Sequence, residues 1–354
     1  MILQKIKLTD FRNFEEKILE ISPQVTVIVG PNALGKTNIL ESIYLLSTGK
    51  SFKAKVEEEM INLEKDIARV KGRVFDEEES IDLEIVLTRG FIDIGKSAPE
   101  KVARKRLLVN GMGKRLLDFS GKLKTTLFGP WDMDLITESP SIRRRFLDNV
   151  LILTDREYHR SLISYEKGLK QRNRLLFRIR EEGLNRSQLL FWDRLLIKNG
   201  DYIMNKREEL ITFMNNSPEL DSQIFNIEYD RSTISESRLE EYKEEEIQAA
   251  TTLVGPHRDD IIFYIGEKRD LAKYGSRGEQ RMGVLWAKLN ELNYIETTTG
   301  ERPVLLLDDI FSELDHKHRK IVMEYARKQQ TIITTADEHF IEDFKKVEKI
   351  KLGK

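Results

Sequence analysis

Gly30-Pro-Asn-Ala-Leu-Gly-Lys-Thr37 is the stretch of sequence that decides the fold of this chain. The apolar run Val25–Val29 precedes it, and an apolar-rich segment with helical character follows from Asn38 to Leu46. A strand, a glycine-rich loop, Lys-Thr and a helix in this order are typical of a phosphate-binding P-loop. The alternative is a plain glycine turn between a strand and a helix.

The chemistry of a P-loop assigns a role to each of these residues. Glycines let the backbone turn tightly, and the loop N–H groups and the helix N-terminus then point at an anion. Lys36 is expected to reach the β- and γ-phosphates, and the Thr37 hydroxyl is expected to ligate Mg²⁺. The predicted ATP-binding residues are Gly30, Pro31, Asn32, Ala33, Leu34, Gly35, Lys36, Thr37 and Asn38.

Composition limits the class of protein. The 354 residues include 40% hydrophobic residues and no cysteine, which excludes disulfides and thiol nucleophiles. No apolar run approaches the length that spans a membrane, so we expect a cytoplasmic protein without a membrane partner. The net charge of −1 indicates that the molecule as a whole is not a general polyanion binder.

A second signal is the apolar run Val304–Leu307 followed by Asp308-Asp309. Carboxylates at the end of a buried strand lie at the sheet edge where α/β proteins bind ligands. We expect Asp308 to hold Mg²⁺, together with Thr37, and Asp309 to orient or deprotonate the attacking water. With Lys36 these are the predicted catalytic residues. The alternative is a strand followed by an acidic helix cap.

A third signal is Ser276-Arg-Gly-Glu-Gln-Arg281. Ser276 and Glu279 match a capping box, which by itself explains both residue types. Gly278 is a poor choice in the first turn of a helix and indicates that a ligand comes close to the backbone. The alternative to a plain cap is therefore a second phosphate-binding surface at Ser276, Arg277, Gly278, Glu279 and Gln280.

The order of predicted elements indicates one α/β core interrupted by a helical insertion. Strand patterns fill residues 1–130, two long helical patterns follow from Ser141 to about Glu182 and from about Ser187 to Asn215, and strands resume near Phe225. We predict a discontinuous ATPase lobe formed by residues 1–135 and 250–354, and a helical arm or second lobe formed by residues 136–249.

These motifs, in this order, resemble the ATP-binding-cassette ATPases of the SMC branch, and specifically the RecF family of bacterial recombination mediators. The resemblance covers nearly the whole chain and is carried by a series of short segments: Phe11-Arg-Asn-Phe14, Gly35-Lys-Thr-Asn38 with Glu41, Ser51-Phe52, Arg143-Arg-Arg-Phe-Leu-Asp148, Gly255-Pro-His-Arg-Asp-Asp260, Ser276–Arg281 and Leu305–Asp315.

The resemblance implies an SMC-like P-loop head with a mixed sheet and an inserted, mainly helical second lobe. It also implies that ATP joins two copies face to face, with Ser276 of one copy contacting the γ-phosphate bound by the other, and Ser312 and Asp315 lining the dimer interface. The implied function is ATP-dependent DNA binding in recombinational repair and replication restart, with weak DNA-stimulated ATP hydrolysis. The implied partners are DNA, the mediators RecR and RecO, and the recombinase RecA.

The sequence departs from the cassette pattern at three places. Aspartate stands at position 309 where a glutamate is usual, which favours slow turnover. The switch histidine would fall near Asp337, and Trp131–Asp134 stands in the region of the cassette glutamine. A further segment, His257–Asp260, could be a metal cluster or a structural turn, and Arg12 could lie near the phosphates or pair with an acidic surface residue.

Basic residues are concentrated in two segments. They indicate sequence-tolerant contacts to duplex DNA phosphates, although charge runs also occur on ordinary solvated faces. The candidate DNA-binding residues are Lys167, Lys170, Arg172 and Arg174 in the first arm helix, with Arg104 and Lys105 near a strand. Two other functions remain open: an ATPase subunit of another assembly, such as a transporter, and a nucleotide-gated scaffold with negligible turnover.

Overall fold

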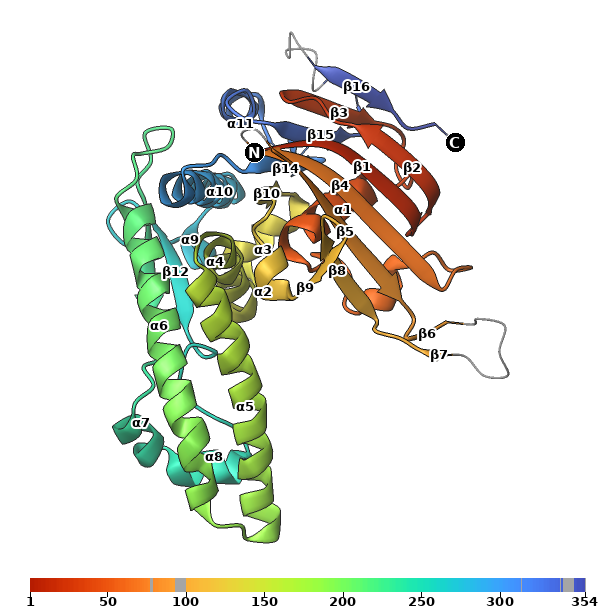
Figure 1. Cartoon of the computed structure of the whole chain (residues 1–354). Helices are drawn as coiled ribbons and strands as arrows, with labels where there is room; N and C mark the ends of the chain where they lie inside the picture. Colours follow the sequence, from red (N-terminus) through yellow and green to blue (C-terminus); the bar gives the residue numbers. More distant parts are fainter. Residues whose placement is uncertain (77–78, 93–99, 313, 338, 340–346, 354) are drawn as a thin grey trace. The chain divides into compact units, whose positions relative to one another are not determined.

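The structure is a computed structural model, and it describes residues 1–76, 79–92, 100–312, 314–337, 339 and 347–353. Contacts within the chain divide it into two compact units, which are Met1–Asp132 with Ile295–Lys354, and Met133–Tyr294. Figure 1 shows the elements of both units along the chain.

The first unit contains an antiparallel and a parallel sheet. The antiparallel sheet has the order β2-β1-β4-β5-β8-β9, and the parallel sheet has the order β10-β14-β15-β3-β16. The strands are β1 (Ile2–Phe11), β2 (Phe14–Glu20), β3 (Val25–Val29), β4 (Ile67–Asp76), β5 (Glu79–Thr88), β8 (Lys105–Val109), β9 (Met112–Lys114), β10 (Thr125–Phe128), β14 (Val304–Asp308), β15 (Thr331–Thr335) and β16 (Glu348–Lys351).

Short elements complete this unit around two longer helices. The helices α1 (Lys36–Thr48) and α11 (His316–Ala326) follow β3 and β14 along the chain. The remaining elements are the hairpin β6 (Phe91–Ile92) and β7 (Glu100–Lys101), the helix α2 (Leu116–Phe119), and the 3₁₀ turns η1 (Glu57–Met60), η2 (Pro130–Met133, which ends at the unit boundary) and η4 (Ile310–Ser312).

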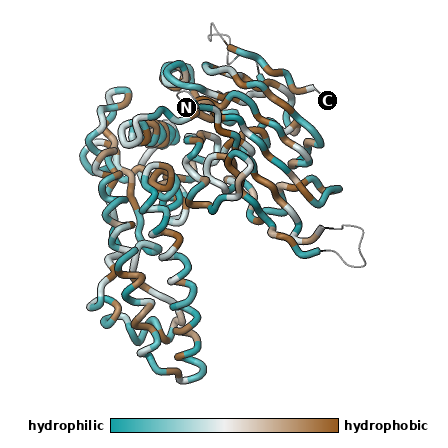
Figure 2. The backbone as a smooth tube through the Cα atoms, in the orientation of Figure 1, coloured by the Kyte–Doolittle hydropathy of each residue, from teal (hydrophilic) through white to brown (hydrophobic). Residues whose placement is uncertain are grey.

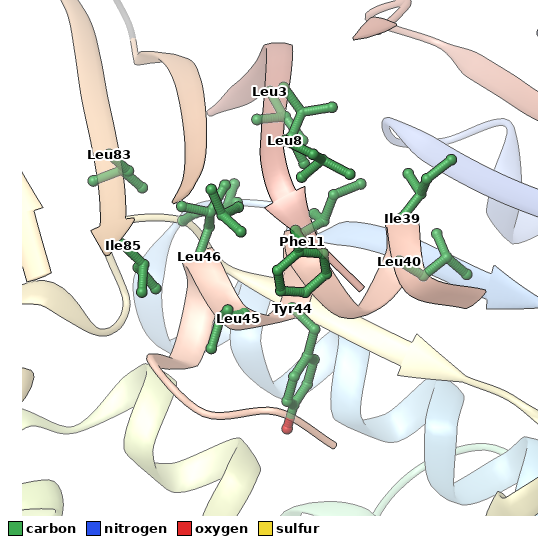
Figure 3. Packing of buried hydrophobic residues seen from close by; sticks show 14 of the residues in the cluster. Leu3, Leu8, Phe11, Ile39, Leu40, Tyr44, Leu45, Leu46, Leu83 and Ile85 are labelled. Atoms are coloured by element: carbon green, nitrogen blue, oxygen red, sulfur yellow. The ribbon is translucent and has the colours of Figure 1, made fainter. Parts of the chain in front are cut away.

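Helix α1 lies between the two sheets of the first unit. It contacts β4 and β5 of the antiparallel sheet, and β10, β14 and β15 of the parallel one. Apolar side chains of α1, such as Leu45 and Leu46, pack against β1 and β5 in the same buried cluster (Figure 3). Because both sides of α1 are covered, the loop that precedes it is held by the core rather than by local sequence alone.

The second unit contains a long antiparallel helix pair and a three-stranded sheet. Helices α5 and α6 run side by side (Figure 1), and apolar and polar residues alternate along both of them (Figure 2). The sheet has the order β11-β12-β13. The elements are α3 (Asp134–Thr137), α4 (Pro140–Thr154), α5 (Arg156–Glu182), η3 (Arg186–Leu189), α6 (Leu190–Asn215), β11 (Phe225–Asp230), α7 (Glu236–Glu241), α8 (Lys243–Ala249), β12 (Asp260–Ile265), β13 (Arg269–Asp270), α9 (Leu271–Tyr274) and α10 (Arg277–Thr299).

The sequence-based elements agree with this structure in type, with two corrections. The helical pattern from Ser141 to Glu182 forms two helices, because Asp155 is extended and its side chain accepts the N–H of Tyr158 to cap α5. The inserted unit also contains a sheet, since β11 pairs with β12 along its whole length.

The boundary between the two units also differs from the prediction, which had the chain return to the ATPase lobe at residue 250. Residues 250–294 group with the arm, and the chain re-enters the first unit at Ile295, within α10. The physical reason is packing within the second unit: β12 pairs with β11, and the ring of Trp286 in α10 lies 5.9 Å from that of Phe225.

A buried polar network holds the start of the arm together. Arg207 is 2% exposed and donates to Asp148, Asp259 and the Pro256 carbonyl. Its three partners satisfy a charge that would otherwise be costly to bury. The segment Gly255–Asp260 therefore has a structural role, and no group of three or more potential metal ligands occurs in the described part of the chain.

His257 belongs to the same region and is held neutral. Its Nε2 lies 3.0 Å from the Thr252 carbonyl and must donate, so Nδ1 accepts from the Tyr165 hydroxyl 2.8 Å away. Burial, which disfavours the charged imidazolium, lowers the pKa of His257 from 6.5 to about 4.

Folding stability should therefore fall as the pH falls from 6.5 towards 4. In this window the unfolded imidazole binds a proton that the folded one does not, whereas above 6.5 both are neutral. We expect His257 to account for a loss of about 2 kcal/mol in the free energy of unfolding between pH ~7 and pH ~5. Denaturant titrations at the two pH values measure it, and His257→Gln should remove this component. An equal pH dependence in the variant would contradict the assignment.

Candidate nucleotide-binding site

The P-loop residues surround the N-terminus of α1. Gly35 has a φ of 93°, and a Cβ at this position would lie 2.6 Å from Asn13 Oδ1 and 2.7 Å from Phe14 Cζ. Both the backbone angle and the close approach require glycine here. The loop therefore has the tight turn at the helix N-terminus that phosphate binding uses.

Lys36 donates to its own loop, and Thr37 contacts the second predicted Mg²⁺ ligand. Lys36 is 7% exposed, and its amine donates to the carbonyls of Gly30 (2.6 Å) and Pro31 (3.0 Å), so it lies over the loop. The Thr37 hydroxyl donates to Asp308 Oδ1 at 3.1 Å. The two groups predicted to hold Mg²⁺ thus meet, although 271 positions separate them.

Sheet topology explains why Thr37 and Asp308 meet. β15 lies between β3 and β14, and all three are parallel, so their carboxyl ends share one edge. Asp308 is 3% exposed and also accepts the Thr334 hydroxyl of β15 at 2.5 Å. A hydroxyl and a carboxylate oxygen are hard ligands suited to Mg²⁺, which takes its other ligands from phosphates and water.

Asp309 follows in a left-handed conformation, with a φ of 49°. Its N–H donates to the Thr334 carbonyl at 3.1 Å and lies 3.2 Å from the Thr334 hydroxyl. The chain turns sharply at this residue, so Asp309 stands at the strand end beside Asp308 and does not continue the strand. This placement is compatible with the water-orienting role predicted for it.

Ser276 forms a complete capping box at the start of α10. Its N–H donates to Glu279 Oε2 at 2.8 Å, and the Glu279 N–H donates to Ser276 Oγ at 3.3 Å. The hydrogen bond from the Ser276 N–H is the main cause of the lowered pKa of Glu279, and the hydrogen bond from Arg269 is the second. A Cβ at Gly278 would meet nothing within 4 Å, and Ser276, Arg277 and Gly278 are exposed. Capping thus explains Ser276 and Glu279, but packing among the described residues does not explain Gly278.

The remaining signature residues also have local roles. Gln280 donates to the Leu271 carbonyl at 3.1 Å. Ser312 Oγ donates to the Asp309 carbonyl at 2.7 Å, and Asp315 caps α11 by accepting the His318 N–H at 3.0 Å. That N–H is the main cause of the lowered pKa of Asp315. Glu313, between them, lies outside the described residues.

Arg12 pairs with an acidic residue. Its guanidinium makes two hydrogen bonds to the buried carboxylate of Glu41, at 2.8 and 2.6 Å. The expected pairing with an acidic surface residue is wrong in its partner, because Glu41 is buried. No signal in the sequence pointed to this pairing.

The candidate DNA-binding residues do not share one environment. Arg172 is 1% exposed and bonds to Asp193, Glu246 and Thr252, so its predicted surface role is wrong. It faces α6 and α8, whereas Lys167, Lys170 and Arg174 on the same helix are exposed and have no ion pair within the described part of the chain. In the first unit, Arg104 pairs with Glu58, and Lys105 pairs with Glu57.

Comparisons with known proteins show the family to which this chain is related. Residues 2–354 match the model of the RecF/RecN/SMC N-terminal domain family. The chain is 36% identical to the DNA replication and repair protein RecF of Herpetosiphon aurantiacus, over 97% of this chain and 94% of that protein. It is 35% identical to the RecF of Lachnoclostridium phytofermentans, over 96% and 94% respectively.

Solved structures show the same relationship in three dimensions. The recombination mediator protein RecF-ATPrS superposes with a TM-score of 0.88 and 32% identity, over 99% of this chain and 96% of that one. RecF-ATP gives a TM-score of 0.87 and 31% identity, over 100% and 96%. Both are described as parts of the RecFOR pathway.

The fold and the loop geometry define a P-loop head of the SMC type with an inserted arm. Within that class, the chain belongs to the RecF family. The expected α/β fold with a P-loop head and a second lobe is thereby confirmed. In the described residues, no helix is both long and apolar enough to cross a membrane.

The buried position of Arg172 gives a direct prediction. Arg172→Ala leaves the carboxylate of Glu246, which is 1% exposed, without its cation, so the free energy of unfolding should fall by about 3–5 kcal/mol. The matched control is Arg174→Ala, two residues along the same helix, which should change it by less than about 0.5 kcal/mol. Denaturant unfolding of both variants measures the difference. Equal stabilities would contradict the structural role of Arg172.

Proposed function

We propose that this chain is an ATP-dependent DNA-binding protein of recombinational repair and replication restart. The observation that carries the nucleotide part is the contact of Thr37 with Asp308, which joins the P-loop to the carboxyl end of a second strand. The DNA and repair part is supported by relatives named DNA replication and repair protein and by RecF structures with ATP or ATPrS in their descriptions. As the family resemblance implies, the partners are DNA, RecR, RecO and RecA, and the compartment is the cytoplasm.

ATP hydrolysis uses the residues at the edge of the parallel sheet. Lys36 neutralises phosphate charge, Thr37 and Asp308 hold Mg²⁺, and Asp309 orients the attacking water. The carboxylate of Asp309 reaches less far than that of a glutamate, so turnover is slow, and DNA stimulates it. Slow turnover suits a protein whose ATP-bound state is the one that acts.

The ATP-bound state is a dimer in this proposal. Ser276 to Gly278 form an exposed helix start with open space at Gly278, which suits the phosphates held by a second copy, and the half-buried Glu279 and Gln280 follow in the same turn. Ser312 and Asp315 follow the catalytic carboxylates and line the same interface. ATP binding assembles the dimer on DNA, and hydrolysis releases it.

The dimer gives a prediction that light scattering can test. Asp309→Asn should bind ATP and accumulate as a dimer, because hydrolysis is blocked while the phosphate contacts remain. Lys36→Met should stay monomeric and lose ATPase activity. Ser276→Arg should bind ATP as a monomer, whereas the control Ser237→Arg, an exposed serine in α7, should dimerise.

The opposite results distinguish the alternatives. A monomeric Asp309→Asn protein at saturating ATP would contradict the dimer and reduce Ser276 to a helix cap. A wild-type dimer with no measurable turnover above that of Lys36→Met would favour the nucleotide-gated scaffold.

DNA binding is assigned to the exposed side chains of α5. Lys167, Lys170 and Arg174 recur every three or four residues, so they share one face of the helix and can follow a phosphate backbone. Three cations per copy give about six phosphate contacts per dimer, which corresponds to a slope of about −5 for log affinity against log salt. Arg104 and Lys105 add contacts only if their ion pairs to Glu58 and Glu57 open.

Replacing the three α5 cations together by alanine should move the salt slope for duplex DNA from about −5 towards zero. Fluorescence anisotropy with one duplex, an ATP analogue and a salt series measures this change. Arg178→Ala is the control, because Arg178 already pairs with Glu182 on the same helix. An unchanged slope in the triple variant, or equal DNA affinity with ATP, ADP and no nucleotide, would contradict this assignment.

A further inference from the structure

A buried ion pair between Glu41 and Arg12 lies close to the P-loop. Glu41 is 0% exposed and stands in α1, one turn after Thr37. Both of its carboxylate oxygens accept from Arg12, and Oε1 also accepts the Ser51 hydroxyl at 2.5 Å. The third Arg12 donor, Nη1, is used by the Glu59 carbonyl at 2.6 Å. All three guanidinium nitrogens of Arg12 therefore donate to protein oxygens.

This pair fixes the turn between β1 and β2. Arg12 has a φ of 54°, a conformation that is unfavourable for a non-glycine residue and persists only when the surroundings impose it. The Arg12 N–H donates to the Met60 carbonyl at 2.9 Å, and the Asn62 N–H donates to the Asp10 carbonyl at 2.8 Å. The turn is therefore held by its side chain and its backbone together.

The residue after Arg12 contacts the P-loop. Asn13 Nδ2 donates to the Leu34 carbonyl at 3.3 Å, and Asn13 Oδ1 accepts from Asn38 Nδ2 at 2.8 Å. The same oxygen lies 2.6 Å from the position that a Cβ of Gly35 would take. One amide thus touches the loop before Lys36 and the helix after Thr37.

A second path leads from Glu41 to the same place. Ser51, whose hydroxyl donates to Glu41, accepts the N–H groups of Lys53 (2.9 Å) and Ala54 (2.7 Å). The Lys53 amine then donates to Asn38 Oδ1 at 3.3 Å. Both the turn at Asn13 and the turn at Lys53 therefore bond to Asn38, and both depend on the carboxylate of Glu41.

We propose that Glu41 and Arg12 are positioning residues for nucleotide binding, acting through Asn13 and Asn38 on the P-loop. The pair holds the Asn13 amide against Leu34 and Asn38, and the loop keeps the shape in which its N–H groups converge on phosphate. In this role Arg12 acts through its ion pair with Glu41, which neutralises its charge. This inference rests on the proposed function, because it assumes that the P-loop binds ATP.

The relay is tested by the ATP affinity of three variants in the full-length protein, with a fluorescent ATP analogue as probe. Asn13→Ala removes only the amide, and losing one such hydrogen-bonded group should weaken ATP binding about 3- to 10-fold. Glu41→Gln should weaken it about 10-fold, and adding Asn13→Ala to it should cause no further loss, because both act on one contact. The paired Arg12→Gln/Glu41→Gln variant, which buries no charge, replaces Glu41→Gln if that protein does not fold.

Steady-state kinetics separate positioning from general destabilisation. KM for ATP should rise while kcat stays unchanged, because the relay contacts the binding loop and not Asp308 or Asp309. The controls are Asn62→Ala, which removes a side-chain amide that accepts the Glu64 N–H, and Glu301→Gln, which removes the partly buried partner of Lys124. Both should bind ATP as the wild type does, at a temperature well below unfolding.

The outcomes distinguish this inference from the proposed function. If Lys36→Met binds ATP as tightly as the wild type, the P-loop assignment itself fails. If Lys36→Met loses ATP binding while folded Asn13→Ala and Glu41→Gln bind normally, only the positioning role is overturned. A loss in Asn13→Ala with normal binding in the Glu41 variant also overturns it, because the pair would then not act through the amide.

Discussion

The arrangement of this head depends on one buried carboxylate, that of Asp308. Its Oδ1 accepts the hydroxyls of Thr37, at the start of α1, and of Thr334, at the end of β15. Three segments that are far apart in the sequence, namely α1, β14 and β15, therefore meet at one carboxylate oxygen. Because a buried carboxylate is costly without such partners, the contact fixes the P-loop helix relative to the parallel sheet.

Around this contact, apolar packing holds the helix of the nucleotide site, and polar contacts hold the loop before it. Helix α1 is covered by both sheets, so the Thr37 end of the helix is set by packing. The loop before it is held by the Asn13 amide, while the Lys36 amine donates to the Gly30 carbonyl. In the proposed function, a nucleotide thus meets a fixed helix N-terminus and a lysine amine that can exchange loop carbonyls for phosphate oxygens.

The second unit uses buried charge for a different purpose. Arg172 and Arg207 each join elements of the arm through two carboxylates, and neither is available to a ligand. Their sequence environment does not distinguish them from the exposed Lys170 and Arg174. Buried arginines that have all their partners hold long helices in register, while the exposed cations of the same helix are left for DNA in the proposed function.

The sequence by itself determined the elements whose signals are local. The P-loop between β3 and α1, the Asp-Asp end of β14 and the capping box at Ser276 all follow from backbone chemistry within a few residues. The tertiary structure alone decided the partners of charged side chains, such as Glu41 for Arg12 and Glu246 for Arg172, and the return of the chain at Ile295 instead of residue 250. The reason is that the order of charged residues along one helix does not indicate which face of that helix will be buried. It also does not indicate which distant carboxylate will pair with a buried cation.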